Sequence, residues 1–523
     1  MHACGSWARW KARARQASPL LFTLTPTPLS PLDLAVIAAY FALTLGIGLW
    51  VTRRQSSAGD YFLGARDLPA WAIMLSIVAT ETSALTVISV PGVGARGDLT
   101  FLQLAFGYLL GRILVARWLL PGYFTGEQET AYARLETRFG VHTRRLLSVS
   151  FLSTRFLADG VRVFAGAIPL ALITGWEITW AIVVMGIVTM IYTLVGGLKA
   201  VVFADVIQLV VYVAGGIGAL FVAWSLAGGA GPALSMAQEA GKLHLFEWQF
   251  SFTVPYTFLG GLIGGAMLSA ASHGTDHLIV QRLLATRSLA DARLALVGSG
   301  VLVILQFGLF LMVGVAIWAA GLAPEELPSD QIFPRFIIDH LPSGLSGLVI
   351  AGILAAAMST LSSSINALAS SMTNDLYAGW TGRRDPAHLL RVGRLFSLAW
   401  GILLVGAALG FHFSASRTDT PVVVLALSIA SVTYGALLGT YILAGRWPRA
   451  TGPDVILGAV TTIIVMLGIV FAARLAVLPG LGWLEPAGRV SFIWYVPIGT
   501  LITIGVGMLS SLRRPPTPTE AAT

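Results

Sequence analysis

Apolar stretches of about 20 residues recur along this chain from about residue 33 to about residue 510. A helix of that length crosses the hydrocarbon core of a bilayer, and in lipid only helices and closed barrels satisfy every backbone hydrogen bond. Hydrophobic residues make up 56% of the chain and charged residues 11%, and no long polar insertion separates the stretches. The sequence therefore predicts an all-α integral membrane protein, built as one domain of about 13 transmembrane helices.

Loops rich in Gly, Pro and charged residues separate the predicted spans. The spans centre near residues 34–51, 69–93, 99–121, 146–173, 177–195, 203–226, 254–275, 295–320, 343–372, 393–411, 421–443, 454–474 and 491–510. Basic residues concentrate in alternate connections, including Arg53, Arg54, Arg134, Arg138, Arg144, Arg145, Arg383 and Arg384. Because basic loops stay cytoplasmic, we expect a plasma (inner) membrane protein with its N-terminus outside and its C-terminus in the cytoplasm. The net charge of +8 then reflects topology rather than a nucleic-acid surface.

The two ends of the chain differ from the spans. Residues 1–32 combine a basic start with a proline-rich stretch, Pro19 to Pro31, which is too interrupted for a helix. We predict a disordered N-terminal tail there, or upstream sequence included by a wrong start, and a C-terminal tail at residues 513–523. The only cysteine is Cys4, so an intrachain disulfide and a cysteine-ligated metal cluster are excluded.

Hydroxyl side chains crowd into one membrane-depth segment, Leu354 to Leu368. It contains Ser359, Thr360, Ser362, Ser363 and Ser364. A single hydroxyl in a membrane helix commonly bonds to the carbonyl four residues earlier or joins two helices. So many hydroxyls together, beside interrupted helices, favour a site for an oxygen-seeking cation such as Na⁺.

Two spans are interrupted by small and polar residues. One contains VATETSAL (Val78 to Leu85) and the other GGAMLSAASHGTDH (Gly264 to His277), five spans later. That spacing is the one at which a five-plus-five inverted repeat places its two discontinuous helices, with core repeats at about residues 69–226 and 254–443. The alternative is that the Gly and Ser residues only allow close helix packing.

Five motifs in order along the chain resemble the sodium:solute symporter family. They are DYFLGARDLPAWA (Asp60 to Ala72), ATETSALTVISVPG (Ala79 to Gly92), YTLVGGLKAVVFADVIQ (Tyr192 to Gln208), GTDHLIVQRLLATRSLADA (Gly274 to Ala292) and AAAMSTLSSSINALASSMTNDLY (Ala355 to Tyr377). The resemblance covers about residues 33–445 and implies a LeuT-type core. It identifies the family and does not discriminate among sugar, amino acid and carboxylate substrates.

The resemblance also implies sodium ligands. In the family's main sodium site, carbonyls of the first core helix and a carbonyl with two hydroxyls of the eighth bind the ion. The matching residues here are Ala79, Thr82, Ala356, Ser359 and Thr360. Such a cage of carbonyls and hydroxyls suits a monovalent ion that must also be released.

Some members have a second sodium site, for which the matching residues are Asp205, Ser362 and Ser363, with Ser359 shared. One or two coupling sodium ions are therefore expected, and no organic cofactor. The alternative for Asp205 is a solvated charge at a helix end beside Lys199.

The candidates for the substrate site lie at membrane depth. They are Thr80, Glu81, Ser83, Asp159, Arg162, Ser269, Ser272 and His273. An ionised carboxylate at membrane depth is costly unless paired, so Glu81 faces a substrate amine, a proton or a partner side chain, or it is protonated and caps a half-helix. Asp159 and Arg162 share one helical face and either neutralise each other or border the substrate. His273 is either a pocket residue or a structural histidine.

These features predict a sodium-coupled secondary active symporter that imports a small polar organic solute by alternating access. Its partners are the solute, sodium ions and the lipid bilayer, and no nucleic acid. No HExxH, GxSxG or Walker signature points to an enzyme. The alternative from another class is a sodium-responsive membrane sensor module or a channel-like protein.

Overall fold

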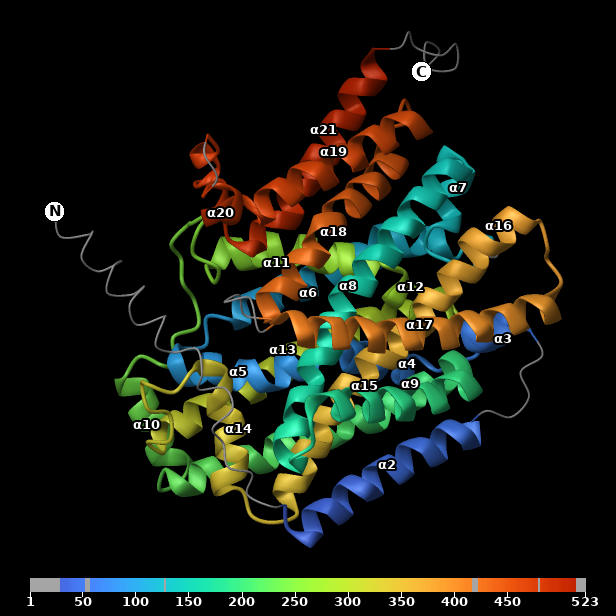
Figure 1. Cartoon of the computed structure of the whole chain (residues 1–523). Helices are drawn as coiled ribbons and strands as arrows, with labels where there is room; N and C mark the ends of the chain where they lie inside the picture. Colours follow the sequence, from blue (N-terminus) through green and yellow to red (C-terminus); the bar gives the residue numbers. More distant parts are fainter. Residues whose placement is uncertain (1–28, 52–56, 127, 416–421, 478–479, 514–523) are drawn as a thin grey trace.

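The structure is a computed structural model that describes residues 29–51, 57–126, 128–415, 422–477 and 480–513. Within these ranges the chain is mostly helical, and its one β-bridge joins Leu68 to Thr286. Eight helices of the described part are long and apolar enough to cross a membrane, or nine if one bent pair forms a single span. The all-α membrane architecture is thereby confirmed (Figure 1), whereas the count of about 13 spans stays a prediction. Residues 1–28 and 514–523, which make up most of the two predicted tails, lie outside the described residues.

The helices of the bundle are α2 (Pro31–Val51), α4 (Ala70–Glu81), α5 (Ala84–Arg96), α6 (Leu102–Leu114), α8 (Val141–Thr174), α9 (Ile178–Leu226), α11 (Phe258–Gly274), α12 (His277–Leu284), α13 (Leu289–Ala319), α15 (Leu345–Ser371), α17 (Pro386–Ala415), α18 (Val422–Arg446), α19 (Gly452–Val470) and α21 (Tyr495–Leu512). Short helices connect them: α3 (Ala58–Leu63), α7 (Ala133–Phe139), α10 (Ala230–Glu239), α14 (Ser329–His340), α16 (Ala378–Thr381) and α20 (Ala472–Leu475). Because α2 begins at Pro31, the predicted tail ends slightly before residue 32.

The predicted interruption of the second span is a sharp bend. α4 ends at Glu81, α5 begins at Ala84, and the two axes differ by 69°. The last backbone hydrogen bond of α4 runs from the Thr82 N–H to the Val78 carbonyl, at 3.1 Å. The carbonyls that follow Val78 therefore lie beyond the helical ladder and can accept other partners.

The second discontinuous helix breaks later than its polar segment suggests. α11 stays regular through Gly274, and only Thr275 and Asp276 separate it from α12. Asp276 starts α12 because its Oδ1 accepts the N–H of Leu278 at 2.9 Å, which is a normal N-cap. Ser269, Ser272 and His273 consequently lie on the last turns of a regular helix rather than in an unwound segment.

Close packing explains why α11 does not unwind earlier. A side chain at Gly107 of α6 would collide with the carbonyl of Gly261, and one at Gly111 would collide with the carbonyl of Ala266. The small residues of α11 thus let two backbones touch, which was the alternative interpretation of this span.

The spans predicted at 177–195 and 203–226 are two helical segments that meet without a loop, and together they make up α9. It bends at Gly197, where φ is 55° and ψ is −154°, a conformation that L side chains rarely adopt. A side chain there would also collide with the backbone of Tyr61. This glycine therefore replaces the expected loop.

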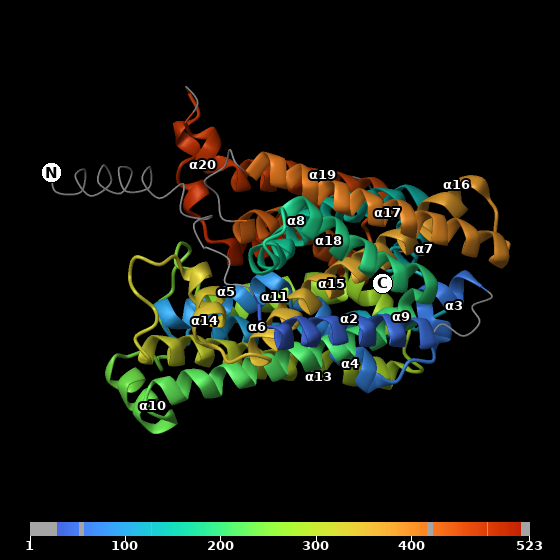
Figure 2. The same cartoon turned by 60° about the horizontal axis from the view of Figure 1, so that its bottom comes forward.

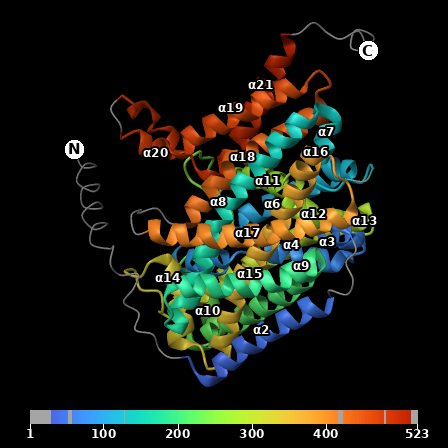
Figure 3. The same ribbon diagram turned by 45° about the vertical axis from the view of Figure 1, so that its right-hand side comes forward.

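α15 lies at the centre of the bundle and is almost entirely buried. It contacts α9, α8, α17 and α2 on its flanks and α4, α5 and α12 along the broken helices. Figures 1 and 3 show α2 at one edge and α18, α19 and α21 together at another, and in Figure 2 α2 lies in front, beside α9. The hydroxyl-rich segment is thus shielded from lipid by protein on its sides.

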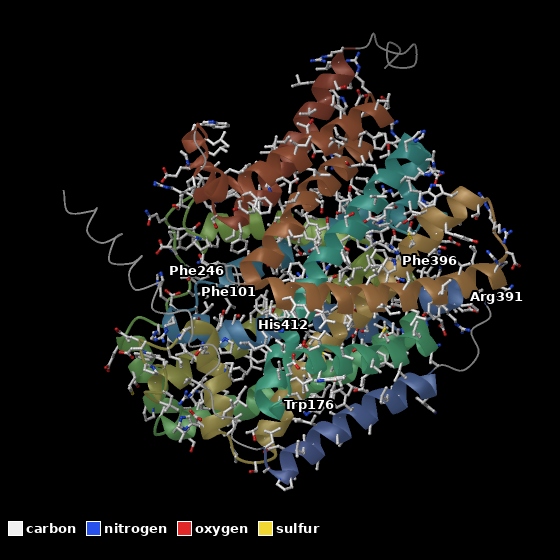
Figure 4. The ribbon with its side chains drawn as sticks, in the orientation of Figure 1. Phe101, Trp176, Phe246, Arg391, Phe396 and His412 are labelled. Carbon is white, nitrogen blue, oxygen red and sulfur yellow. The ribbon has the colours of Figure 1, made fainter. Side chains whose placement is uncertain are left out.

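The bundle has two distinct ends. In Figures 1 and 3, α3, α7 and α16 lie at one end, and α10, α14 and α20 at the other. Figure 4 labels Arg391 at the first end and Phe246 at the second. The short helices α7 and α16, which adjoin the basic connections around Arg138 and Arg383, therefore lie at the same end of the molecule as Arg391.

Candidate functional site

The hydroxyl face of α15 carries the residues that match the main sodium site. Ala356, Ser359 and Thr360 are all buried. Thr360 donates its hydroxyl hydrogen to the Ala356 carbonyl at 3.1 Å, and Ser359 donates to Oδ1 of Asp205 at 2.7 Å. Because both hydroxyl hydrogens are engaged, the lone pairs of the two oxygens remain for a cation.

The other two expected ligands lie at the end of α4. Ala79 and Thr82 are buried, and the Thr82 hydroxyl accepts a hydrogen bond from Nε2 of Gln306 at 2.7 Å. α4 packs against α15, and the hydroxyls of Thr80 and Ser363 lie 3.2 Å apart across this contact. The oxygens offered by the two helices are carbonyls and hydroxyls, and this donor set fits sodium.

Asp205 of α9 is fully buried and is not the solvated helix-end charge that the alternative described. Its carboxylate accepts hydrogen bonds from Ser359 (2.7 Å) and from Ser76 of α4 (2.6 Å), and Thr80 approaches at 3.4 Å. The hydroxyl of Ser363 lies beside this group, 3.2 Å from the Thr80 hydroxyl. The structure therefore brings together α4, α9 and α15 at the expected second sodium site.

One residue of this cluster was missed from the sequence. Arg282 of α12 is fully buried and forms an ion pair with Asp205, with Nη2 3.2 Å from Oδ2. The same Nη2 donates to the Ser363 hydroxyl. Ser362, another expected ligand, donates its hydroxyl to the Ser359 carbonyl at 3.1 Å.

Glu81, at the α4–α5 break, has a partner side chain. Its carboxylate contacts the guanidinium of Arg112 in α6, which is fully buried and also donates to Ser299 at 2.7 Å. His273 of α11 places Nε2 3.6 Å from the Glu81 carboxylate, and Ser272 lies 2.8 Å from Nδ1 of His273. The partner was missed, although an arginine inside an apolar span is itself a signal.

Several buried polar atoms beside Glu81 make no hydrogen bond within the described part of the chain. They are Nε of Arg112, Nε2 of His273 and Oγ of Ser269. Ser269 and His273 are four residues apart and share one face of α11, which packs on α6. Buried polar atoms in native proteins are normally paired, so this group is a candidate for solute or water contact.

A second charged cluster joins α8, α12 and α18. Arg155 donates to Asp276 from Nε (3.0 Å) and Nη2 (2.6 Å), and the Tyr434 hydroxyl donates to the same oxygen at 2.9 Å. Arg162 donates to Asp159 at 3.1 Å, and this pair corresponds to the mutual neutralisation considered above. Arg155 and Asp276 were missed because they are far apart in sequence.

The remaining candidates occupy different places. Thr80 points to Asp205 and Ser363 rather than to Glu81. Ser83 precedes α5, and its hydroxyl lies 3.3 Å from that of Thr86. Asp159 is fully buried against α15, where it accepts the Ser364 hydroxyl at 2.5 Å.

Comparisons with known proteins agree with this geometry. A family model described as "Sodium:solute symporter family" matches residues 61–465. The sodium/sialic acid symporter NanT of Aliivibrio fischeri (strain ATCC 700601 / ES114) is 28% identical, over 92% of this chain and 93% of its own length. The human sodium/iodide cotransporter is 31% identical, over 85% of this chain and 70% of its own length.

The fold is also similar to a solved structure of a Na⁺-coupled sialic acid symporter in a substrate-bound outward-open state. The two share 26% sequence identity and superpose with a TM-score of 0.82, over 93% of this chain and 99% of that one. The similarity therefore extends over nearly the whole described bundle.

Proposed function

This chain belongs to the sodium:solute symporter family and is a sodium-coupled symporter, and we propose that its ions and its solute bind around the α4–α5 break. The observation that supports this most directly is the arrangement of α4 against α15. It brings the free carbonyls of a broken helix to a hydroxyl-rich face at the centre of the bundle.

In the main site, Ala79, Thr82, Ala356, Ser359 and Thr360 supply the oxygens. Sodium bound there joins α4 to α15. If the ion and the solute favour the same conformation, each increases the affinity for the other, which is the basis of coupled transport. The membrane voltage adds about 2.3 kcal/mol per charge per 100 mV to inward sodium movement. Asp205, with Ser359, Ser362 and Ser363, provides a second site, so the coupling number is one or two.

We place the solute beside Glu81, among the unpaired atoms of Arg112, Ser269 and His273. Because Arg112 already balances the charge of Glu81, a net-neutral polar solute fits this site without an uncompensated buried charge. Oxygens of such a solute would accept hydrogen bonds from Arg112 and Ser269. Arg162 and Ser83, which are less buried, border the same region in this proposal.

The finer features of the fold belong to the same proposal. The bundle consists of about 13 spans with core repeats at residues 69–226 and 254–443, related as in LeuT-type carriers. The end with α3, α7 and α16 faces the cytoplasm of the plasma (inner) membrane, since it carries the basic connections. The sensor or channel alternative is not favoured, because the relatives are coupled carriers.

Counterflow in liposomes tests the function. The purified protein is reconstituted, and labelled candidate sugars, amino acids, amides and monocarboxylates are supplied with an inward sodium gradient. We expect one class to accumulate only with the gradient, and excess unlabelled solute inside to accelerate entry. Entry that neither depends on sodium nor responds to internal solute would contradict coupled transport.

A further inference from the structure

The carboxylate of Asp205 accepts three close hydrogen bonds from buried donors. Oδ1 accepts the Ser359 hydroxyl, and Oδ2 accepts the Ser76 hydroxyl and Nη2 of Arg282. Sodium requires oxygen lone pairs directed at it, and here N–H and O–H hydrogens point at both lone pairs of Oδ2 and at one lone pair of Oδ1 instead. As arranged, these residues hold a guanidinium rather than a metal ion.

Arg282 is held as firmly as its carboxylate partner. Its Nε donates to the Ser76 hydroxyl at 2.9 Å and Nη1 donates to the Leu278 carbonyl at 2.9 Å. Nη2 donates to both Asp205 and Ser363. Every guanidinium nitrogen is thus bonded, and the ion pair has no exposed surface on either side.

We propose that the guanidinium of Arg282 is a tethered cation that occupies the second sodium site and must leave Asp205 before sodium can bind there. The proposal rests on the proposed function for the identity of the competing ion. A single buried carboxylate balances one positive charge, and a second cation beside it would be an uncompensated charge in a medium of low polarity. Sodium and Arg282 therefore exclude each other.

The competition links the second site to the helix that carries Arg282. Arg282 belongs to α12, which contacts α15 through two further polar bonds, from Gln281 to Asn366 (2.7 Å) and between His277 and Ser370 (3.1 Å). When Arg282 is released from Asp205, α12 loses this charged contact and keeps the two neutral bonds to α15. Sodium in the second site is then expected to loosen α12, the half-helix that follows the break.

Direct sodium binding without solute tests the proposal. Binding of radioactive sodium to purified protein in detergent is measured for wild type, Arg282→Gln and Ser76→Ala. Arg282→Gln leaves Asp205 without its cation, so the half-saturating sodium concentration of the second site should fall by about tenfold or more. Ser76→Ala removes one hydrogen-bond partner of Arg282, and Ser76 is not a proposed sodium ligand. The half-saturating sodium concentration of the second site should therefore fall about threefold in this variant.

Two controls separate the possible outcomes. Arg287→Gln changes an exposed arginine just beyond α12, paired with Asp67 at 2.7 Å, and should not alter sodium binding. Thr360→Ala should weaken only the main site, and if it has no effect the main-site assignment fails while the Arg282 result still stands.

Sodium binding that is unchanged or weaker in Ser76→Ala would overturn the proposal, because a purely structural arginine predicts no gain. Unchanged or weaker sodium binding in Arg282→Gln would overturn the proposal independently, provided that size-exclusion chromatography shows this variant to be folded. Ser76→Ala is a small change at a buried site, so the proposal can still be refuted if Arg282→Gln does not fold.

Discussion

Replacing Glu81 by Gln should destabilise the folded protein rather than only weaken solute binding. Arg112 has no exposed surface, and after the substitution its charge would retain Ser299 but lose its counter-ion. Removing one partner of a buried ion pair typically costs about 3–5 kcal/mol of stability. For a chain of this size, we convert that to a melting temperature lower by roughly 3–10 °C.

The measurement is thermal denaturation of purified protein in detergent at fixed sodium concentration, for Glu81→Gln, Arg112→Gln and the double variant. The double variant restores charge balance, so it should be more stable than the sum of the two single effects by about 2 kcal/mol or more. Strictly additive losses, or a Glu81→Gln variant as stable as wild type, would refute the argument that the pair is energetically coupled.

Three further outcomes are expected. Ser359→Ala combined with Thr360→Ala removes two oxygens of the main site, and sodium-dependent uptake should shift to concentrations at least about tenfold higher. Arg155→Gln leaves Asp276 buried without a cation, so the melting temperature should fall, and adding Asp276→Asn should restore part of it. Gly107→Val forces α6 away from α11, and size-exclusion chromatography should show loss of the folded monodisperse peak.

A control for Gly107→Val comes from a glycine that has space around it. Nothing lies within 4 Å of a side chain added at Gly406 in α17, so Gly406→Val should keep the folded peak. An unchanged sodium curve in the double hydroxyl variant at normal expression would exclude the main-site assignment. A full loss of stability in Arg155→Gln that Asp276→Asn does not relieve would show that Arg155 acts through other contacts.

The sequence by itself determined the membrane class and the family, because both depend on local patterns. Hydropathy over about 20 residues is set by the transfer of side chains into lipid and needs no tertiary information. The bend after Glu81 was also predictable from a local pattern, because the polar residues that interrupt this span are consecutive in the sequence. The hydroxyl-rich segment of α15 was likewise visible, although its burial at the centre was not.

Tertiary structure alone decided which charges meet. Asp205 and Arg282 are 77 positions apart, and Arg155 and Asp276 are 121 apart, so no local pattern pairs them. It also decided that α11 continues as a helix to Gly274, because the backbone of α6 lies against its glycines. The physical reason is common to both cases. At membrane depth a charge or a bare backbone is tolerated only when packing supplies its partner, and packing is a property of the assembled bundle.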